Sequence, residues 1–147
     1  MQEIREIIIN AFIGKKVTKV TAGGGNGSVV ILRFGENLFS LFIYCIWRLE
    51  ENNKIVTGWN ESCDAETGNL TKQIKLLLND EIKKTEVSNL MDIKIYFVSG
   101  KVLNIFCDIT PMYEPKEYDE NWVISDIAND ISYRFKSSFE IEICKYS

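Results

Sequence analysis

The stretch DIKIYFVSGKVLNIFCD, residues 92–108, has the clearest strand pattern in the chain. In its first half the apolar residues Ile93, Ile95 and Phe97 alternate with Lys and Tyr, as in a β-strand with one buried face. A Ser-Gly pair at 99–100 is typical of a tight turn, and a second apolar run follows it. The stretch therefore predicts an antiparallel hairpin.

Similar strand patterns occur on both sides of this hairpin. The expected strands cover residues 16–21, 28–34, 38–49, 54–59, 82–87, 122–124, 131–135 and 139–144. The glycine-rich segment GGGNG at 23–27 separates the first two, and Gly and Asn tolerate the positive φ angles of a hairpin tip. Phosphate-binding loops are also glycine-rich, but they open a helix, whereas a strand pattern follows here. A flexible hairpin tip is therefore favoured.

Two short amphipathic helices are expected in addition to the strands. Apolar residues recur at helical spacing between Ile4 and Phe12, and again between Leu70 and Leu78. Strands and helices together predict a single α+β domain over residues 1–147. We expect a mostly antiparallel curved sheet with an N-terminal helix and one mid-chain helix.

The composition excludes several classes of function. The 147 residues contain no histidine, which rules out Ser–His and Cys–His nucleophile pairs and every metal site that uses histidine. With 17 Lys and Arg against 21 Asp and Glu the net charge is −4, whereas binding to a nucleic-acid backbone needs clustered basic residues. We therefore expect no enzymatic activity, no cofactor and no nucleic-acid partner.

The sequence favours a cytoplasmic protein. Its first residues lack the basic start and the small-residue cleavage site of a signal peptide. The most apolar run, residues 38–47, is well short of the ~20 residues that span a bilayer, so no membrane association is expected. The four widely spaced cysteines, Cys45, Cys63, Cys107 and Cys144, are expected to be reduced thiols. Two disulfides in a secreted protein are the alternative.

The acidity of the chain is concentrated in residues 108–130. This segment has seven acidic residues and one lysine, a local charge of −6, so the rest of the chain carries +2. Three interpretations stay open: a solvated loop that keeps the protein soluble, an acidic surface for a partner, and a group of carboxylates that holds Mg²⁺. The spacing of a calcium-binding EF-hand loop is missing.

The three tryptophans lie in different sequence settings. Trp47 belongs to the most apolar run and is expected in the core. Trp59 and Trp122 each neighbour an asparagine in a polar setting. Each is either an anchor for a partner, because tryptophan is enriched at interface hot spots, or a residue that pins a loop to the core.

Three stretches together resemble a known group of proteins: YCIWRLEENNKIVTGW at 44–59, the hairpin at 92–108, and ENWVISD at 120–126. In this order they are similar to small uncharacterised bacterial proteins, some of which are found among immunity-type proteins of polymorphic toxin systems. The resemblance covers about residues 38–126 and includes no catalytic motif. It implies, by analogy at the level of the fold, an inhibitor that binds a toxin.

The expected function is a non-enzymatic protein-binding module, an immunity-type inhibitor whose partner is a protein such as a basic toxin domain. An acidic surface on the inhibitor attracts a basic partner and speeds association. The expected contact residues are Glu114, Glu117, Asp119, Glu120 and Trp122.

Two other functions remain open from the sequence. One is the binding of a small ligand on the concave face of the sheet, with Tyr96, Phe106 and Trp59 as lining residues. The other is a hydrolase in which carboxylates hold a metal ion.

Overall fold

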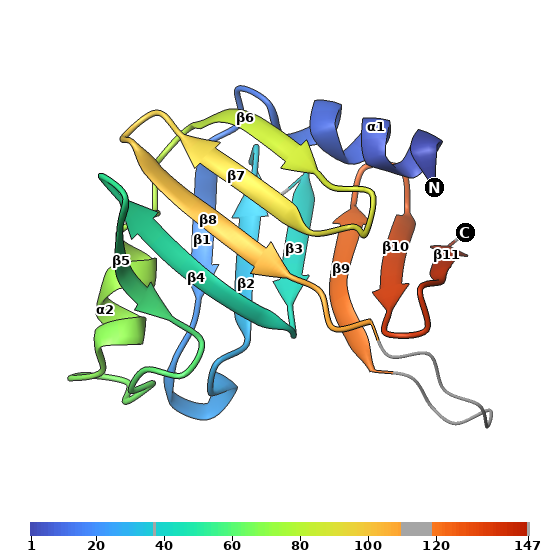
Figure 1. The fold of residues 1–147 in the computed structure, drawn as a ribbon. Helices are drawn as coiled ribbons and strands as arrows, with labels where there is room; N and C mark the ends of the chain where they lie inside the picture. Colours follow the sequence, from blue (N-terminus) through green and yellow to red (C-terminus); the bar gives the residue numbers. More distant parts are fainter. Residues whose placement is uncertain (37, 110–118, 147) are drawn as a thin grey trace.

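The fold is described by a computed structural model, which covers residues 1–36, 38–109 and 119–146. Within these residues, eleven strands form two antiparallel sheets (Figure 1). The six-stranded sheet has the order β1 (Val17–Thr21), β2 (Val30–Phe34), β3 (Phe39–Ile43), β9 (Glu120–Asp126), β10 (Ile131–Lys136) and β11 (Ile141–Lys145). The five-stranded sheet has the order β5 (Lys54–Gly58), β4 (Ile46–Glu51), β8 (Lys101–Phe106), β7 (Ile93–Phe97) and β6 (Ile82–Val87).

The two sheets face each other across one hydrophobic core. In Figure 1 the five-stranded sheet crosses in front of β1, β2 and β3 at an oblique angle. Burial alternates along the strands: in β2 Val30, Leu32 and Phe34 are buried and the residues between them are not. Trp47 from one sheet and Trp122 from the other are the largest fully buried side chains. Removal of this apolar surface from water is the main term that stabilises the fold.

Each helix packs beside an edge strand of the five-stranded sheet. These helices are α1 (Gln2–Phe12), beside β6, and α2 (Asn69–Lys75), beside β5. α1 buries Ile8 and Phe12, and the Phe12 ring lies 4.9 Å from the ring of Phe34. The Arg5 guanidinium donates hydrogen bonds of 3.1 and 2.8 Å to the carbonyl of Val87 at the end of β6. Neither helix in the described residues is long and apolar enough to cross a membrane.

The α+β class, the antiparallel pairing and the two helices are confirmed; most strand ends shift by one or two residues, and the predicted strand at 38–49 and the second helix differ more. The strand expected at 38–49 is two strands: β3 ends at Ile43, β4 begins at Ile46, and they belong to different sheets. The run is apolar on both sides of the crossing, at Phe42, Ile43, Ile46 and Trp47, so composition does not mark the place where the chain changes sheets. The second helix ends at Lys75, and Leu78, which the helical spacing included, is exposed.

The glycine-rich segment joins β1 and β2, which confirms the predicted hairpin. Its tip is packed against α2: Gly23 has a φ of 74°, and a Cβ at this position would overlap the hydroxyl of Thr71. The next amide, that of Gly24, donates a hydrogen bond to the carbonyl of Cys63 (2.6 Å). Glycine is therefore required at position 23 both by the backbone angle and by the lack of space.

Candidate functional site

The chain crosses between the two sheets at one end of the molecule, and Asn121 holds this place together. β3 leads into β4 there, and β8 is followed later in the chain by β9 (Figure 1). The Asn121 carbonyl accepts hydrogen bonds from the amides of Tyr44 and Cys45 (2.9 and 3.2 Å). Its side chain bonds the backbone of Asp108 with both its oxygen (2.7 Å) and its nitrogen (2.9 Å). One buried asparagine thus joins the chain just after β3 to the chain just after β8.

A groove with a volume of about 420 Å³ opens beside this crossing. We call it the crossover groove and define it by Tyr44, Ile46, Trp59, Phe106, Asp119 and Glu120, which all line it. A second hollow of about 410 Å³ continues it along the outer face of the five-stranded sheet and shares Ile46, Trp59 and Phe106 with it. Large apolar side chains are therefore exposed along one continuous depression.

The apolar residues of the crossover groove are partly exposed to solvent. Tyr44 and Ile46 each have 45% of their surface exposed, and Trp59 has 43%. Ile46 faces outward because β4 alternates, with Trp47 buried next to it. The backbone amide of Trp59 donates to the carbonyl of Trp47 (3.0 Å), so the exposed indole extends from a fixed main chain.

Phe106 is held in place by its polar neighbours on the outer face of the sheet. The Arg48 guanidinium lies over its ring, 4.8 Å from the centroid. Arg48 also forms an ion pair with Glu50 (2.9 Å), and Glu50 accepts a hydrogen bond from the side chain of Asn104 (3.0 Å). These contacts fix the position of Phe106 in the floor of the groove.

The rim of the groove is acidic. Asp108 and Asp119 line it and are exposed, and Glu61 lines the adjoining hollow. Glu120 forms an ion pair with Arg134 (2.7 Å). Burial raises the pKa of the Tyr44 phenol above its usual value, and the negative charge of Glu120 raises it further. The Tyr44 hydroxyl in the groove is therefore neutral at physiological pH, as that of an unperturbed tyrosine also is.

The predicted contact residues are only partly brought together. Asp119 and Glu120 both line the crossover groove. Glu114 and Glu117 lie outside the described residues. Trp122 is fully buried, so the expectation that it lies on a contact surface is wrong.

A β-bulge explains why Glu120 and Trp122 face opposite ways. Lys136 of β10 pairs with Glu120 and Phe135 with Trp122, so the chain gains one residue, Asn121, between these pairs. The bulge turns the indole inward, where its Nε1 donates to the carbonyl of Met91 (3.1 Å). The ring also stacks on Phe135, with centroids 5.4 Å apart.

The residues proposed for a small ligand are also divided. Trp59 and Phe106 line the crossover groove together, as expected of two lining residues. Tyr96 lies elsewhere on the sheet, where the ammonium groups of Lys84 and Lys94 are 5.2 and 5.4 Å from its ring centroid. The three aromatic residues therefore do not form one site.

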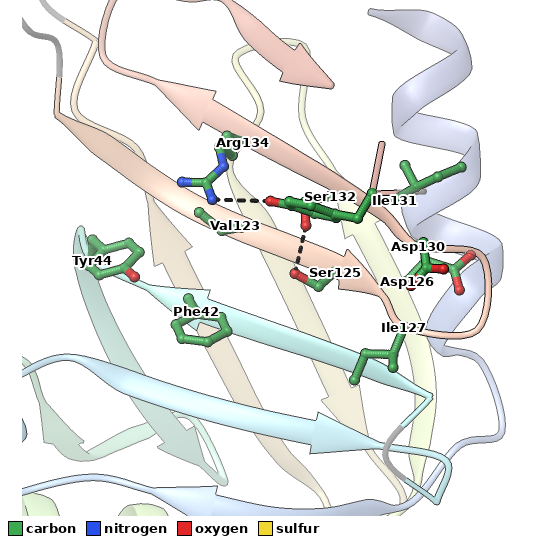
Figure 2. A pocket seen from close by; sticks show the side chains of 11 residues that line it. Phe42, Tyr44, Val123, Ser125, Asp126, Ile127, Asp130, Ile131, Ser132 and Arg134 are labelled. Carbon is green, nitrogen blue, oxygen red and sulfur yellow. Dashed lines mark hydrogen bonds between the residues drawn. The ribbon is translucent and has the colours of Figure 1, made fainter. Parts of the chain in front are cut away.

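A second concave site lies on the outer face of the six-stranded sheet (Figure 2). It has a volume of about 330 Å³ and reaches the crossover groove at Tyr44. Figure 2 shows Phe42 and Tyr44 on one side of it and Arg134 on the other. Arg134 bonds the phenol of Tyr146 and the carboxylate of Glu120, and both contacts raise the pKa of its guanidinium.

Metal ligands are not gathered in the part of the chain that the structure describes. No three Cys, Asp or Glu side chains within it come together in a way that could hold a metal ion. Part of the acidic segment 108–130 lies outside the described residues. All four cysteines are free thiols, and each is partly buried.

Comparisons of the chain with protein-family models, with curated proteins and with solved structures give no match. The resemblance to immunity-type proteins therefore remains a prediction from the sequence.

Sequence reasoning singled out Trp59 but not Tyr44 and Ile46, the other exposed apolar residues of the crossover groove. Ile46 and Tyr44 lie in the most apolar run, which suggests burial. The available signal was the alternation in β4, which places Ile46 on the same face as the charged residues Arg48 and Glu50. A single isoleucine on a charged strand face is ordinary on a protein surface, so Ile46 stands out only because the fold places it in one groove with Tyr44 and Trp59.

Proposed function

We propose that the protein is a non-enzymatic protein-binding module whose partner is a basic protein that docks on the crossover groove. The observation that carries this proposal is the exposure of Tyr44, Ile46 and Trp59 side by side in a groove with an acidic rim. Apolar residues that are exposed singly are ordinary on a protein surface, whereas a contiguous group in a depression is typical of an interaction site.

The composition of the groove supports a protein partner. Tryptophan and tyrosine are over-represented among residues whose truncation costs the most binding energy. Such residues act best when a rigid support holds them and a polar rim surrounds them. Trp59 and Phe106 meet the first condition through their backbone and guanidinium contacts. Asp119 and Glu120 meet the second.

The charge of the groove favours a basic partner. The chain has a net charge of −4. Three residues of its acidic segment 108–130 lie at the rim of the groove: Asp108, Asp119 and Glu120. Charges at the rim of an interface mainly steer the encounter, so association with a basic protein is accelerated at low ionic strength. A basic toxin domain fits this chemistry, and the module is then an immunity-type inhibitor.

The proposal is tested by comparative affinity capture from the native lysate, followed by mass spectrometry. The baits are the wild-type protein, Trp59→Ala, Asp119→Lys and Leu90→Ala. Leu90 is the matched control because it is apolar and 60% exposed but does not line the crossover groove. Each bait is first checked by circular dichroism for a native fold.

We expect one basic protein to be retained by the wild type and by Leu90→Ala and to be lost with Trp59→Ala. Its capture should weaken with Asp119→Lys and with added salt, because screening removes the steering charge. Equal capture by Trp59→Ala and the wild type, or a captured partner that is itself acidic, contradicts the proposal.

A second function, the binding of a small ligand, is favoured by the hollow in Figure 2. Its volume of about 330 Å³ is in the range of small-molecule sites, and polar groups converge on it from neighbouring strands. The hydroxyls of Ser125 and Ser132 lie 3.0 Å apart within it, near Arg134. A thermal-shift screen with a panel of metabolites tests this function: a shift that Ser132→Val abolishes supports it, and no shift across the panel argues against it.

A further inference from the structure

Two cysteines lie opposite each other where β4 begins and β8 ends. Ile46, the first residue of β4, pairs with Phe106, the last residue of β8, in an antiparallel register. Cys45 precedes Ile46, and Cys107 follows Phe106. If the same register continues by one position, the two cysteines lie directly across from each other.

The backbone hydrogen bonds define which kind of cross-strand pair this is. The amide of Cys45 donates to the carbonyl of Asn121 (3.2 Å), and the amide of Cys107 donates to the carboxylate of Asp92 (2.6 Å). Neither amide therefore bonds the opposite cysteine. In such a non-hydrogen-bonded pair the Cα atoms are about 4.5 Å apart, which lies within the range that a disulfide spans.

The two thiols interact with each other, and both are partly accessible. The hydrogen bond with Cys45 and burial raise the pKa of the Cys107 thiol, which also donates to the carbonyl of Met91 (3.1 Å). Both cysteines are only partly buried, and both line the crossover groove. A small oxidant can therefore reach the pair from solvent.

We propose that Cys45 and Cys107 form a redox-modification site, at which a hydroperoxide converts the two thiols into a reversible cross-strand disulfide. This inference goes beyond the proposed binding function and does not depend on it.

The chemistry balances with a hydroperoxide as the two-electron oxidant. Because burial and hydrogen bonding disfavour ionisation of the Cys107 thiol, Cys45 is the first nucleophile: its sulfur loses a proton and attacks the O–O bond. That bond breaks, Cys45 becomes a sulfenic acid, and the alcohol or water leaves. The Cys107 sulfur then attacks the Cys45 sulfur, the S–O bond breaks, and the departing hydroxide takes the Cys107 proton to leave as water. A dithiol reductant reverses the step by thiol–disulfide exchange.

The test uses the variant Cys63→Ser/Cys144→Ser, in which the proposed pair is all that remains of the four cysteines. It is treated with hydrogen peroxide, quenched with catalase, unfolded and alkylated with N-ethylmaleimide. We expect intact mass spectrometry to show a monomer that has lost two hydrogen atoms and takes up no label. Peptide mapping should join the segments that contain Cys45 and Cys107, and dithiothreitol should restore both labels.

Two further results are expected. Cys45→Ser in this background should leave Cys107 open to alkylation after peroxide. The oxidised protein should melt roughly 5–10 °C higher than the reduced one, because the bridge closes a loop of about 60 residues in the unfolded chain. Uptake of both labels after peroxide, oxygen addition without a bridge, or a bridge between two chains overturns the inference.

Discussion

Asn121 and Asp108 bond each other twice, through the side-chain oxygen and nitrogen of Asn121 and the amide and carbonyl of Asp108. This arrangement imitates a short piece of sheet pairing at a place where the strands themselves have ended. It brings Asp108, two residues after the end of β8, onto β9, next to the chain that leads into β4. The shape of the crossover groove therefore depends on one buried amide.

Asn121→Ala is expected to destabilise the protein by about 1–3 kcal/mol, because it leaves buried backbone groups without partners. Urea denaturation followed by circular dichroism measures the change. The control is Asn129→Ala, an exposed asparagine whose side chain bonds only Asp126 in the described residues, for which a change within about 0.5 kcal/mol is expected. Equal effects of the two substitutions would show that Asn121 does not hold the crossing.

Replacement by alanine is expected to lower the stability strongly at Trp122 and only slightly at Trp59, the two tryptophans with asparagine neighbours. Trp122→Ala should cost about 3–5 kcal/mol, because the buried indole fills the space beside Phe135. Trp59→Ala should cost less than about 1 kcal/mol of stability, because nearly half of its surface is exposed. Denaturation curves recorded by circular dichroism provide the comparison. A large loss of stability in Trp59→Ala would mean that Trp59 anchors the loop after β5 to the core and is not a contact residue for a partner.

The comparison of Trp59 with Trp122 also shows how much of the site could be predicted from the sequence. The strands with clear alternation, such as β7, and the helix that buries Ile8 and Phe12 follow from local patterns. Trp59 and Trp122 have the same local setting, and what separates them is a bulge at Asn121 together with the partner strand β10. Such long-range pairing is absent from any short window of sequence.

The exposure of Tyr44 and Ile46 could not be predicted from the sequence for a related reason. Tyr44 and Ile46 lie within an apolar run that contributes a strand to each sheet. Only residues 44 and 45 connect the two strands, and neither is Gly or Pro. The Asn121 carbonyl takes the place of a turn signal by bonding the amides of Tyr44 and Cys45. The fold class was therefore predictable, and the position of the groove was not.

Gly23→Ala is expected to destabilise the protein by about 1–3 kcal/mol, because the new methyl group meets Thr71 and the φ angle is positive. Gly25→Ala is the matched control, since Gly25 has open space around it and no positive φ. In the double variant Gly23→Ala/Thr71→Ala, removal of the hydroxyl should restore part of the loss. Urea midpoints of the wild type, Gly23→Ala, Thr71→Ala and the double variant complete the cycle. A double variant that equals the sum of its parts would contradict the proposed contact.

The stability is expected to fall in acid through two exposed ion pairs. Hydrogen bonds from Lys84 and Lys136 lower the pKa of Glu86 and Glu142, respectively, below the ordinary 4.5. A carboxylate with a lowered pKa in the folded state stabilises the fold above its unfolded pKa, and this contribution is lost as the pH falls through the folded pKa. Because the pairs are exposed, the effect is small and sensitive to salt.

Urea midpoints measured between about pH 5 and pH 3 test this dependence. The wild type should lose stability over this window, and Glu86→Gln/Glu142→Gln should lose less. Added salt of about 0.5 M should bring the two curves together. Parallel curves at low salt would show that these carboxylates do not contribute.

The most direct test of the account is the affinity of the captured partner for Trp59→Ala relative to Leu90→Ala, measured by isothermal titration calorimetry. If the crossover groove is the docking site, Trp59→Ala should weaken binding by at least about 30-fold, the change that accompanies loss of an interface anchor. Leu90→Ala should bind as the wild type does. A partner that binds Trp59→Ala with undiminished affinity would place the interface elsewhere and contradict the central claim.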